Sequence, residues 1–286
     1  MLALTIARLV IVEAFQRRVF QVVVVMVLLL LALSAWTFTH LAGLGVRLAP
    51  FAGLGSDARP VASQLLILLM YLWSTLFAVT AAFLGAAAIA GEVETGDLLT
   101  VLTRPIRRAE FILGRWLGLG VLVGACAAVT TGAQMVLAFV TTGHVPADAP
   151  GVILFVAVEV FVILTLALAL GTRLSAVAAS IGTILAFGLS WTGGVIGGIG
   201  SFAAEPILMQ VSTATKLLLP SDAVWRAALL MLERPGGLFS GARSVTMGAN
   251  PFGSEDASPG LYLVVAAVWI AVVLAAALQS FRTRDL

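Results

Sequence analysis

GEVETGDLLTVLTRPIRRAEFILGRWLG, residues 91–118, lies between two long apolar runs and is the most charged stretch of the chain. It holds eight of the 30 charged residues: Glu92, Glu94, Asp97, Arg104, Arg107, Arg108, Glu110 and Arg115. Elsewhere charge is scarce, since only 10% of the 286 residues are charged and 61% are hydrophobic. A soluble domain has about 25% charged residues. The composition, with a mean hydropathy of +1.11, therefore indicates an integral membrane protein.

Six segments are long and apolar enough to cross a bilayer as helices, which needs about 20 residues each. They are 19–38, 64–90, 116–141, 151–171, 174–201 and 261–281. Only the fourth contains a charged residue, Glu159. Backbone polar groups in lipid must be satisfied within the segment, so we expect an all-α polytopic membrane protein with six spans.

The distribution of basic residues predicts the orientation. If both termini are cytoplasmic, the inner segments carry ten Arg and Lys residues and the longer outer segments carry six. We therefore expect residues 91–118 in the cytoplasm, residues 202–260 outside, and a bacterial inner membrane as the setting. Residues 1–18 are predicted to form an interfacial helix along the membrane surface. The alternative is a simple cytoplasmic extension of the first span.

The charged stretch predicts two short helical pieces. Asp97 suits a helix start, where a carboxylate meets exposed N–H groups. Leu98, Leu99 and Leu102 then share one apolar face, and Pro105 ends the run. A second helix is expected to begin near residues 106–108 and to continue into the third span. An apolar face with charged rims suits docking into a groove on another protein. The alternative is an ordinary solvated loop.

The order of residues in this stretch resembles the coupling segment of ABC-2-type transporter permeases. There a Glu, a Gly, a leucine-rich turn, a Pro and a basic residue follow one another between the second and third spans. Glu94, Gly96, Leu98–Leu102, Pro105 and Arg108 match this order. The stretch looks most like the branch that includes the permease of the nitrous-oxide reductase maturation system.

The resemblance implies that two six-span subunits pair, as two copies or as homologous permeases, and that each coupling segment (residues 91–115) sits on a cytoplasmic ABC ATPase. It also admits a periplasmic accessory protein. Asp97 stands where many members have Thr. The residues to which the resemblance assigns ATPase coupling are Glu92, Glu94, Gly96, Asp97, Leu98, Leu99, Leu102, Arg104, Pro105 and Arg108.

The chain lacks the residues for its own ATP chemistry. A phosphate-binding loop needs a Gly-Lys pair, and the only lysine, Lys216, does not follow a glycine. We expect no enzymatic activity and no cofactor in this chain, with ATP and Mg²⁺ on the partner ATPase. Neither HExxH nor GxSxG occurs, and one cysteine with two distant histidines predicts no metal site. A net charge of +2 is too small to suggest nucleic-acid binding.

Four residues are candidates for the translocation path: Glu159, Gln134, Gly194 and Gly198. A carboxylate inside a span is costly and usually meets a cavity or a partner. Glu159 either contacts substrate or a proton, or locks helices together with Gln134 or a threonine. The glycines of TGGVIGGIGS, residues 192–201, predict close helix approach, or a flexible outer end of the fifth span.

The long segment 202–260 begins with a chain break at Ala204-Glu205-Pro206. Pro220, Ser221 and Asp222 then predict a helix start. One face of this helix is expected to carry Leu218, Trp225, Leu229 and Leu232, with Trp225 and Arg226 at the membrane interface. The segment is either a pair of short re-entrant or interfacial helices, as in ABC-2 permeases, or a surface loop with one amphipathic helix.

The favoured function is the permease subunit of an ABC transporter, most simply an exporter. The alternatives are an ATP-independent channel or secondary transporter, and a scaffold that transmits ATPase motion without transport. An apolar path would suit lipids, drugs or lipid-linked groups, whereas a maturation role would move a metal- or sulfur-related species.

Overall fold

The computed structural model describes residues 2–16, 18–48, 58–92, 108–143, 146, 148–232 and 259–282. Within these residues the chain is helical apart from short connections and has no strand, which confirms the predicted all-α class. The helices are α1 (Leu2–Gln16), α2 (Arg18–Leu48), α3 (Ala58–Ala86), the π-helical η2 (Ala87–Gly91), α6 (Arg108–Thr142), α7 (Ala149–Gly171), α8 (Ala176–Ala203), α9 (Pro206–Leu218), α10 (Ser221–Leu232) and α12 (Pro259–Arg282).

The six predicted spans correspond to the six described helices that are long and apolar enough to cross a membrane. These are Gln21–His40 in α2, Leu65–Gly91 in α3 and η2, Arg108–Thr141 in α6, Ala149–Gly171 in α7, Ala176–Ser201 in α8 and Pro259–Arg282 in α12. α6 begins at Arg108, as expected from the charged stretch, so the helix extends beyond the apolar part of the third span.

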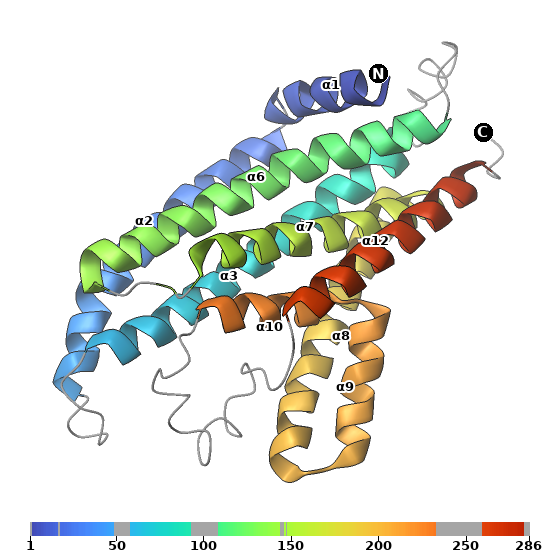
Figure 1. Cartoon of the computed structure of the whole chain (residues 1–286). Helices are drawn as coiled ribbons and strands as arrows, with labels where there is room; N and C mark the ends of the chain where they lie inside the picture. The colour runs from blue at the N-terminus through green and yellow to red at the C-terminus, as the bar shows by residue number, and fades with distance from the viewer. Residues whose placement is uncertain are drawn as a thin grey trace.

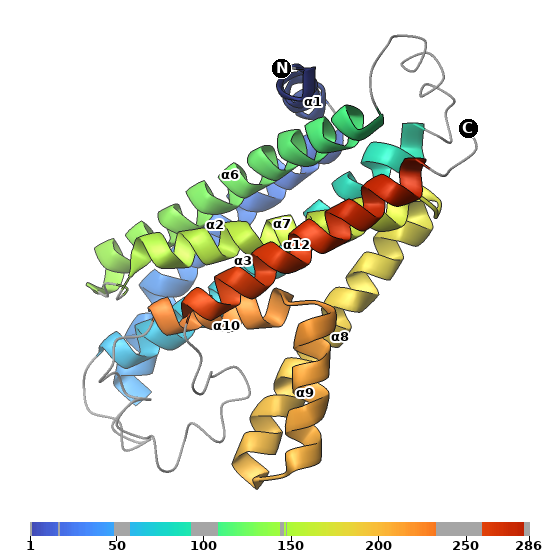
Figure 2. The same cartoon turned by 45° about the vertical axis from the view of Figure 1, so that its right-hand side comes forward.

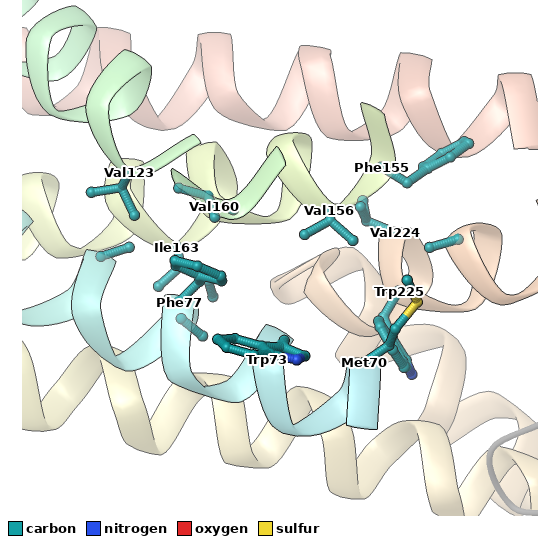
Figure 3. Packing of buried hydrophobic residues seen from close by; sticks show 14 of the residues in the cluster. Met70, Trp73, Phe77, Val123, Phe155, Val156, Val160, Ile163, Val224 and Trp225 are labelled. Carbon is teal, nitrogen blue, oxygen red and sulfur yellow. The ribbon is translucent and has the colours of Figure 1, made fainter. Parts of the chain in front are cut away.

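α7 is the central helix of the bundle. It packs against α3, α6, α8, α10 and α12. Its sequence is apolar on all sides, which is the pattern of a buried helix. Figure 3 shows part of the core, where Trp73 and Phe77 of α3 lie in one buried cluster with Val160 and Ile163 of α7. The Asp148 carboxylate accepts a hydrogen bond from the Gly151 N–H at 3.0 Å and caps the start of α7.

α2 and α12 lie at the periphery and expose apolar side chains. Val264, Val268 and Val272 of α12 are spaced four residues apart and form one exposed stripe. Val22, Leu28 and Leu29 of α2 are likewise exposed. Such faces fit the hydrocarbon of a bilayer, where apolar surface needs no protein cover.

α1 packs against α6, and Figure 1 shows it beside that helix at the top of the view. A glycine allows this contact, because a Cβ on Gly118 would lie 2.8 Å from the carbonyl oxygen of Ala7. α1 covers most of the predicted N-terminal helix 1–18, and Arg8 and Leu9 are exposed on it. Its position along the membrane surface stays a prediction.

α8 and α9 form a hairpin that projects from the bundle (Figure 2). The break falls where the sequence predicts it: α8 ends at Ala203, Ala204 adopts a left-handed φ of 54°, and Pro206 begins α9. α10 begins at Ser221, as the Pro-Ser-Asp pattern predicts. Residues 202–232 therefore contain two helices rather than a loop with one helix. The rest of the outer segment, residues 233–258, lies outside the described residues.

Candidate functional site

Three arginines of the described residues make contacts at one end of the bundle, called the basic end below, where α6 begins and α12 ends: Arg108, Arg115 and Arg173. Two of them tie neighbouring helices to the end of α12. Arg108 Nη1 donates to the carbonyl oxygens of Phe281 and Arg282, both at 3.3 Å. Arg173 Nε donates to Ser280 Oγ at 2.8 Å. The start of α6 and the connection before α8 thus share contacts with the same last turn of α12.

An ion pair joins Glu92 and Arg115, which lie near the two ends of the predicted coupling segment. Glu92 directly follows η2, and its carboxylate pairs with Arg115 of α6. The Arg115 guanidinium also lies over the Phe111 ring, 5.1 Å from its centroid. Both charged side chains are largely buried, so the pair is shielded from solvent. Removing one member of a buried pair is strongly destabilising, because the other charge is left uncompensated.

Two of the predicted coupling residues, Glu92 and Arg108, are described, and both make contacts at the basic end. Sequence reasoning assigns no role to Arg115, although its charge stands in the quoted stretch. The other predicted coupling residues lie outside the described part of the chain: Glu94, Gly96, Asp97, Leu98, Leu99, Leu102, Arg104 and Pro105.

Glu159 lies inside the bundle and is 3% exposed. Ser74 of α3 donates a shared hydrogen bond to its two carboxyl oxygens, at 2.9 and 2.8 Å. The partner of Glu159 is therefore Ser74, and the expected pairing with Gln134 or a threonine is wrong. The contact joins the central helix α7 to α3 at the middle of both helices. The spacing of residues in the sequence could not predict this contact, because 85 residues separate Ser74 from Glu159.

Gln134 of α6 is fully buried at 0% exposed and points toward the same helix α3. The Trp73 indole N–H donates to Gln134 Oε1 at 3.4 Å. Among the described residues the amide nitrogen of Gln134 has no hydrogen-bond partner. Since Trp73 and Ser74 are neighbours, one turn of α3 carries polar contacts to both α6 and α7.

The glycines of α8 form the surface on which α9 and α10 rest. A Cβ on Gly193 would lie 2.0 Å from Thr215 Oγ1, and one on Gly197 would lie 2.2 Å from Ser212 Oγ. A Cβ on Gly194 would lie 2.1 Å from the Asp222 carboxylate. Close helix approach at this glycine stripe is thus observed, between α8 and the two helices after it. Gly198, the last path candidate, is partly buried and its carbonyl accepts a hydrogen bond from Ser201.

Ser190 holds the turn between α9 and α10 in place. Its hydroxyl donates to the Leu219 carbonyl at 2.8 Å and accepts from Ser221 Oγ at 3.1 Å and from the Asp222 N–H at 3.3 Å. One donor and two acceptor positions saturate a serine hydroxyl. Ser190 lies near the middle of α8, so the α9–α10 turn reaches the middle of that span. α10 then returns to the other end of the bundle, where the Asp148 N–H donates to the Met231 carbonyl. This arrangement is a re-entrant hairpin.

A buried ion pair lies at the start of α10, directly after the turn between α9 and α10. Arg226 Nε donates to Asp222 Oδ2 at 2.8 Å, one turn apart on α10. Lys216 of α9 interacts electrostatically with both Arg226 and Asp222. Three charged groups therefore lie within electrostatic reach of one another.

Two expectations for this segment are wrong. Leu218 belongs to α9 and is 73% exposed, so it does not share the buried face of Trp225, whereas Leu229 and Leu232 are buried on α10 with Trp225, as expected. Trp225 and Arg226 are both buried by the chain itself rather than placed at its surface. The Trp225 ring packs edge-on against Tyr71 of α3, with centroids 5.8 Å apart. A Trp-Arg pair near a span suits a membrane interface by composition, but here the turn at Ser190 brings both residues inward.

These features define a polytopic α-helical membrane protein with a six-span bundle, a re-entrant hairpin and a charged connection at one end. The family model of the ABC-2 family transporter proteins matches residues 12–286, nearly the whole chain, and the chain belongs to this family. No curated protein matches the chain significantly. The resemblance seen in the sequence is therefore confirmed for the family, and the narrower branch stays a prediction.

Proposed function

We propose that the chain is the permease subunit of an ABC exporter, and that it couples ATP hydrolysis by a separate ATPase subunit to substrate movement. Membership in the ABC-2 transporter family supports the role of a membrane component. The observation that best supports coupling to an ATPase is the ion pair between Glu92 and Arg115. Because it joins the helices on both sides of residues 93–107, a force on that segment would act on α3 and α6 together.

The contacts of the basic end supply a route for such a force into the bundle. Glu92 is continuous with η2 and α3, and Arg108 bonds to the end of α12. Ser280 of α12 also contacts the connection between α7 and α8 through Thr172 and Arg173. Movements of rigid helices between two packings are a common form of switching. Nucleotide binding in the ATPase would favour one of the two packings.

The partners belong to the same proposal. ATP and Mg²⁺ would bind to the cytoplasmic ATPase, and a second copy of this chain or a homologous permease would complete the membrane part. The gathering of arginines at the basic end supports a cytoplasmic position for it, with both termini inside a bacterial inner membrane. A periplasmic accessory protein and the nitrous-oxide reductase maturation branch stay predictions from the resemblance.

Two regions are candidates for the translocation path. Glu159 and Gln134 are buried within one chain and bond to adjacent residues of α3, which supports a role in holding α3, α6 and α7 together. The α8–α9 hairpin instead exposes the polar side chain of Gln210, together with Thr192 and Thr213, whose hydroxyls donate to carbonyls of their own helices. Exposed polar side chains at membrane depth are favourable where they line an aqueous or substrate-filled space. We place the path along this hairpin, beside Gly194 and Gly198.

Purification of the tagged chain from native membranes in mild detergent tests the proposal. A stoichiometric subunit with a Walker A loop, together with ATP hydrolysis by the complex, is expected. Vesicles reconstituted with that complex should accumulate or expel a substrate when ATP is added. A crosslinked preparation that contains no ATPase would indicate a channel or a secondary transporter. An ATPase complex that hydrolyses ATP but moves no substrate across a panel of lipids and drugs would indicate a scaffold.

A further inference from the structure

Lys216, the only lysine of the chain, lies in the last turn of α9. Its side chain is partly buried, and among the described residues it forms no hydrogen bond and no ion pair within 4 Å. The charged groups that act on it are Arg226 and Asp222 of α10. Lys216 is thus a cation without a dedicated protein anion in the described part of the chain.

The depth of Lys216 makes its charge unusual. The carbonyl of Leu219, three residues further on, bonds to Ser190 near the middle of α8. Ser190 is separated from Ala203, the outer end of α8, by 13 residues or about 20 Å at 1.5 Å per residue. A charge far from the ends of a span is costly unless a partner or water meets it. Its place near the C-terminus of α9 offsets part of that cost through the helix dipole.

The neighbouring charges leave a positive excess. Arg226 is committed to Asp222 through the 2.8 Å hydrogen bond, so these two groups cancel. Lys216 then contributes the remaining charge of +1 to the three groups. Glu159, the other carboxylate in this part of the bundle, is buried inside it and bonds to Ser74. Its charge is therefore not presented on the α8–α9 surface.

Exposed apolar side chains flank Lys216 along α9. Leu217 and Leu218, which come directly after it, are exposed, as is Met209, which lies two turns before it on the same face of the helix. One cationic group among exposed apolar side chains matches a molecule that joins an anionic group to a hydrocarbon body. We propose that Lys216 binds the anionic group, a phosphate ester or a free carboxylate, of a lipid-like amphiphilic substrate on the translocation path. This assignment rests on the proposed transport function.

Because Lys216 is the only lysine, its accessibility can be followed by itself. The full-length chain, with any subunits that copurify, is kept in micelles of digitonin, a detergent with no phosphate or carboxylate group, and treated with an amine-reactive reagent. Peptide mass spectrometry separates labelling at Lys216 from labelling at the N-terminal amine. We expect saturating dodecyl phosphate to slow labelling of Lys216 about tenfold, as expected for a charge-assisted hydrogen bond. Dodecyl maltoside, dodecyltrimethylammonium and inorganic phosphate should leave the rate unchanged.

Each of the other results would overturn the proposal. Equal protection by dodecyl maltoside or dodecyltrimethylammonium would show that any detergent-like chain covers Lys216. Equal protection by inorganic phosphate would show a small-anion site rather than an amphiphile site. Labelling at the same rate with and without dodecyl phosphate would show that Lys216 does not bind the anionic group. Its charge would then act only on the dipole of α9. The labelling experiment needs no ATP hydrolysis. Failure of the binding proposal can therefore be distinguished from failure of the transport proposal, which is tested by copurification and ATP hydrolysis.

Substitutions supply a second measurement, the dodecyl phosphate concentration that raises the Tm of the purified chain half-maximally. Lys216→Gln should increase that concentration at least about tenfold, because it removes the charge of the hydrogen-bond donor. Lys216→Arg should retain the affinity. Arg8→Gln, which removes the charge of an exposed arginine on α1, is the matched control and should also retain it. An unchanged affinity in Lys216→Gln would exclude the lysine as the anion-binding group.

Discussion

Glu92 and Arg115 form an ion pair that closes the polypeptide loop of residues 93–114 at the basic end. One partner directly follows the π-helix at the end of α3, and the other lies two turns inside α6. The segment that we propose meets the ATPase therefore leaves and re-enters the bundle at two points joined to each other. In our proposal this junction transmits movement of the segment to two spans at once.

Arg115→Gln should separate ATP hydrolysis from transport. Loss of one member of this buried pair leaves Glu92 uncompensated, at a cost of about 3 kcal/mol. We expect ATP hydrolysis by the assembled complex to continue while substrate transport in proteoliposomes falls at least about tenfold. The exchange Glu92→Arg with Arg115→Glu should restore part of the transport. Arg8→Gln, at an exposed arginine of α1, is the control and should have no effect. Full transport in Arg115→Gln would contradict the role of the pair.

Leu102→Arg tests the docking face predicted from the sequence. A charge in the apolar face of the coupling segment should prevent burial of that face against the ATPase, since a buried unpaired charge is unfavourable. The variant should insert into the membrane normally but lose its ATPase during purification. Leu102→Met keeps the size and apolar character and should retain the ATPase. If the ATPase copurifies equally with both variants, the docking face lies elsewhere.

Ser74 and Glu159 distinguish a structural carboxylate from one on the substrate path. Ser74→Ala removes the hydroxyl that donates to a buried carboxyl group and should lower the free energy of unfolding by about 1–3 kcal/mol. Glu159→Gln can still accept the hydrogen bond, so transport should survive with a small change in Tm. Thermal unfolding and a transport assay on both variants check this. Loss of transport in Glu159→Gln with an unchanged Tm would instead place Glu159 on the path.

Gly194 and Gly188 form a matched pair on α8. A Cβ on Gly194 would lie 2.1 Å from the Asp222 carboxylate, whereas a Cβ on Gly188 meets nothing within 4 Å. Gly194→Ala should lower stability by about 1–3 kcal/mol, because the re-entrant hairpin must shift to make room. Gly188→Ala should be neutral or stabilise by up to about 1 kcal/mol, since alanine is the better helix former. Equal Tm values for the two variants would contradict the close packing of α10 on α8.

Much of the fold can be predicted from local sequence signals. Apolar length predicts the spans, and the Pro-Ser-Asp pattern predicts the start of α10 at Ser221. The Ala204-Glu205-Pro206 break also falls where α8 ends. These signals depend on neighbouring residues, so no knowledge of the packing is needed. The same holds for the extension of α6 back to Arg108, because the charged turn before the third span keeps helical spacing.

The site depends instead on contacts between distant residues. Nothing near Glu159 in the sequence points to Ser74. Several other serine and threonine hydroxyls lie in the apolar spans, and the sequence does not indicate which of them contacts the carboxyl group. The amphipathic pattern around Arg226 predicts a membrane interface for its side chain. Its burial results from the turn that Ser190 holds, which no local pattern encodes. The charge excess at Lys216 is recognisable only once Arg226 is known to pair with Asp222.

The five residues of the π-helix η2 determine the direction in which the Glu92 side chain points around the helix axis. In a π-helix each hydrogen bond spans one residue more than in an α-helix, so η2 lets the second span reach its end facing in a different direction. A regular α-helix advances by about 100° per residue, and one residue more or less before Glu92 would turn its side chain by that angle. The direction in which the chain continues at Glu92 therefore depends on a short run of Ala, Ile and Gly, which carries no charge at all.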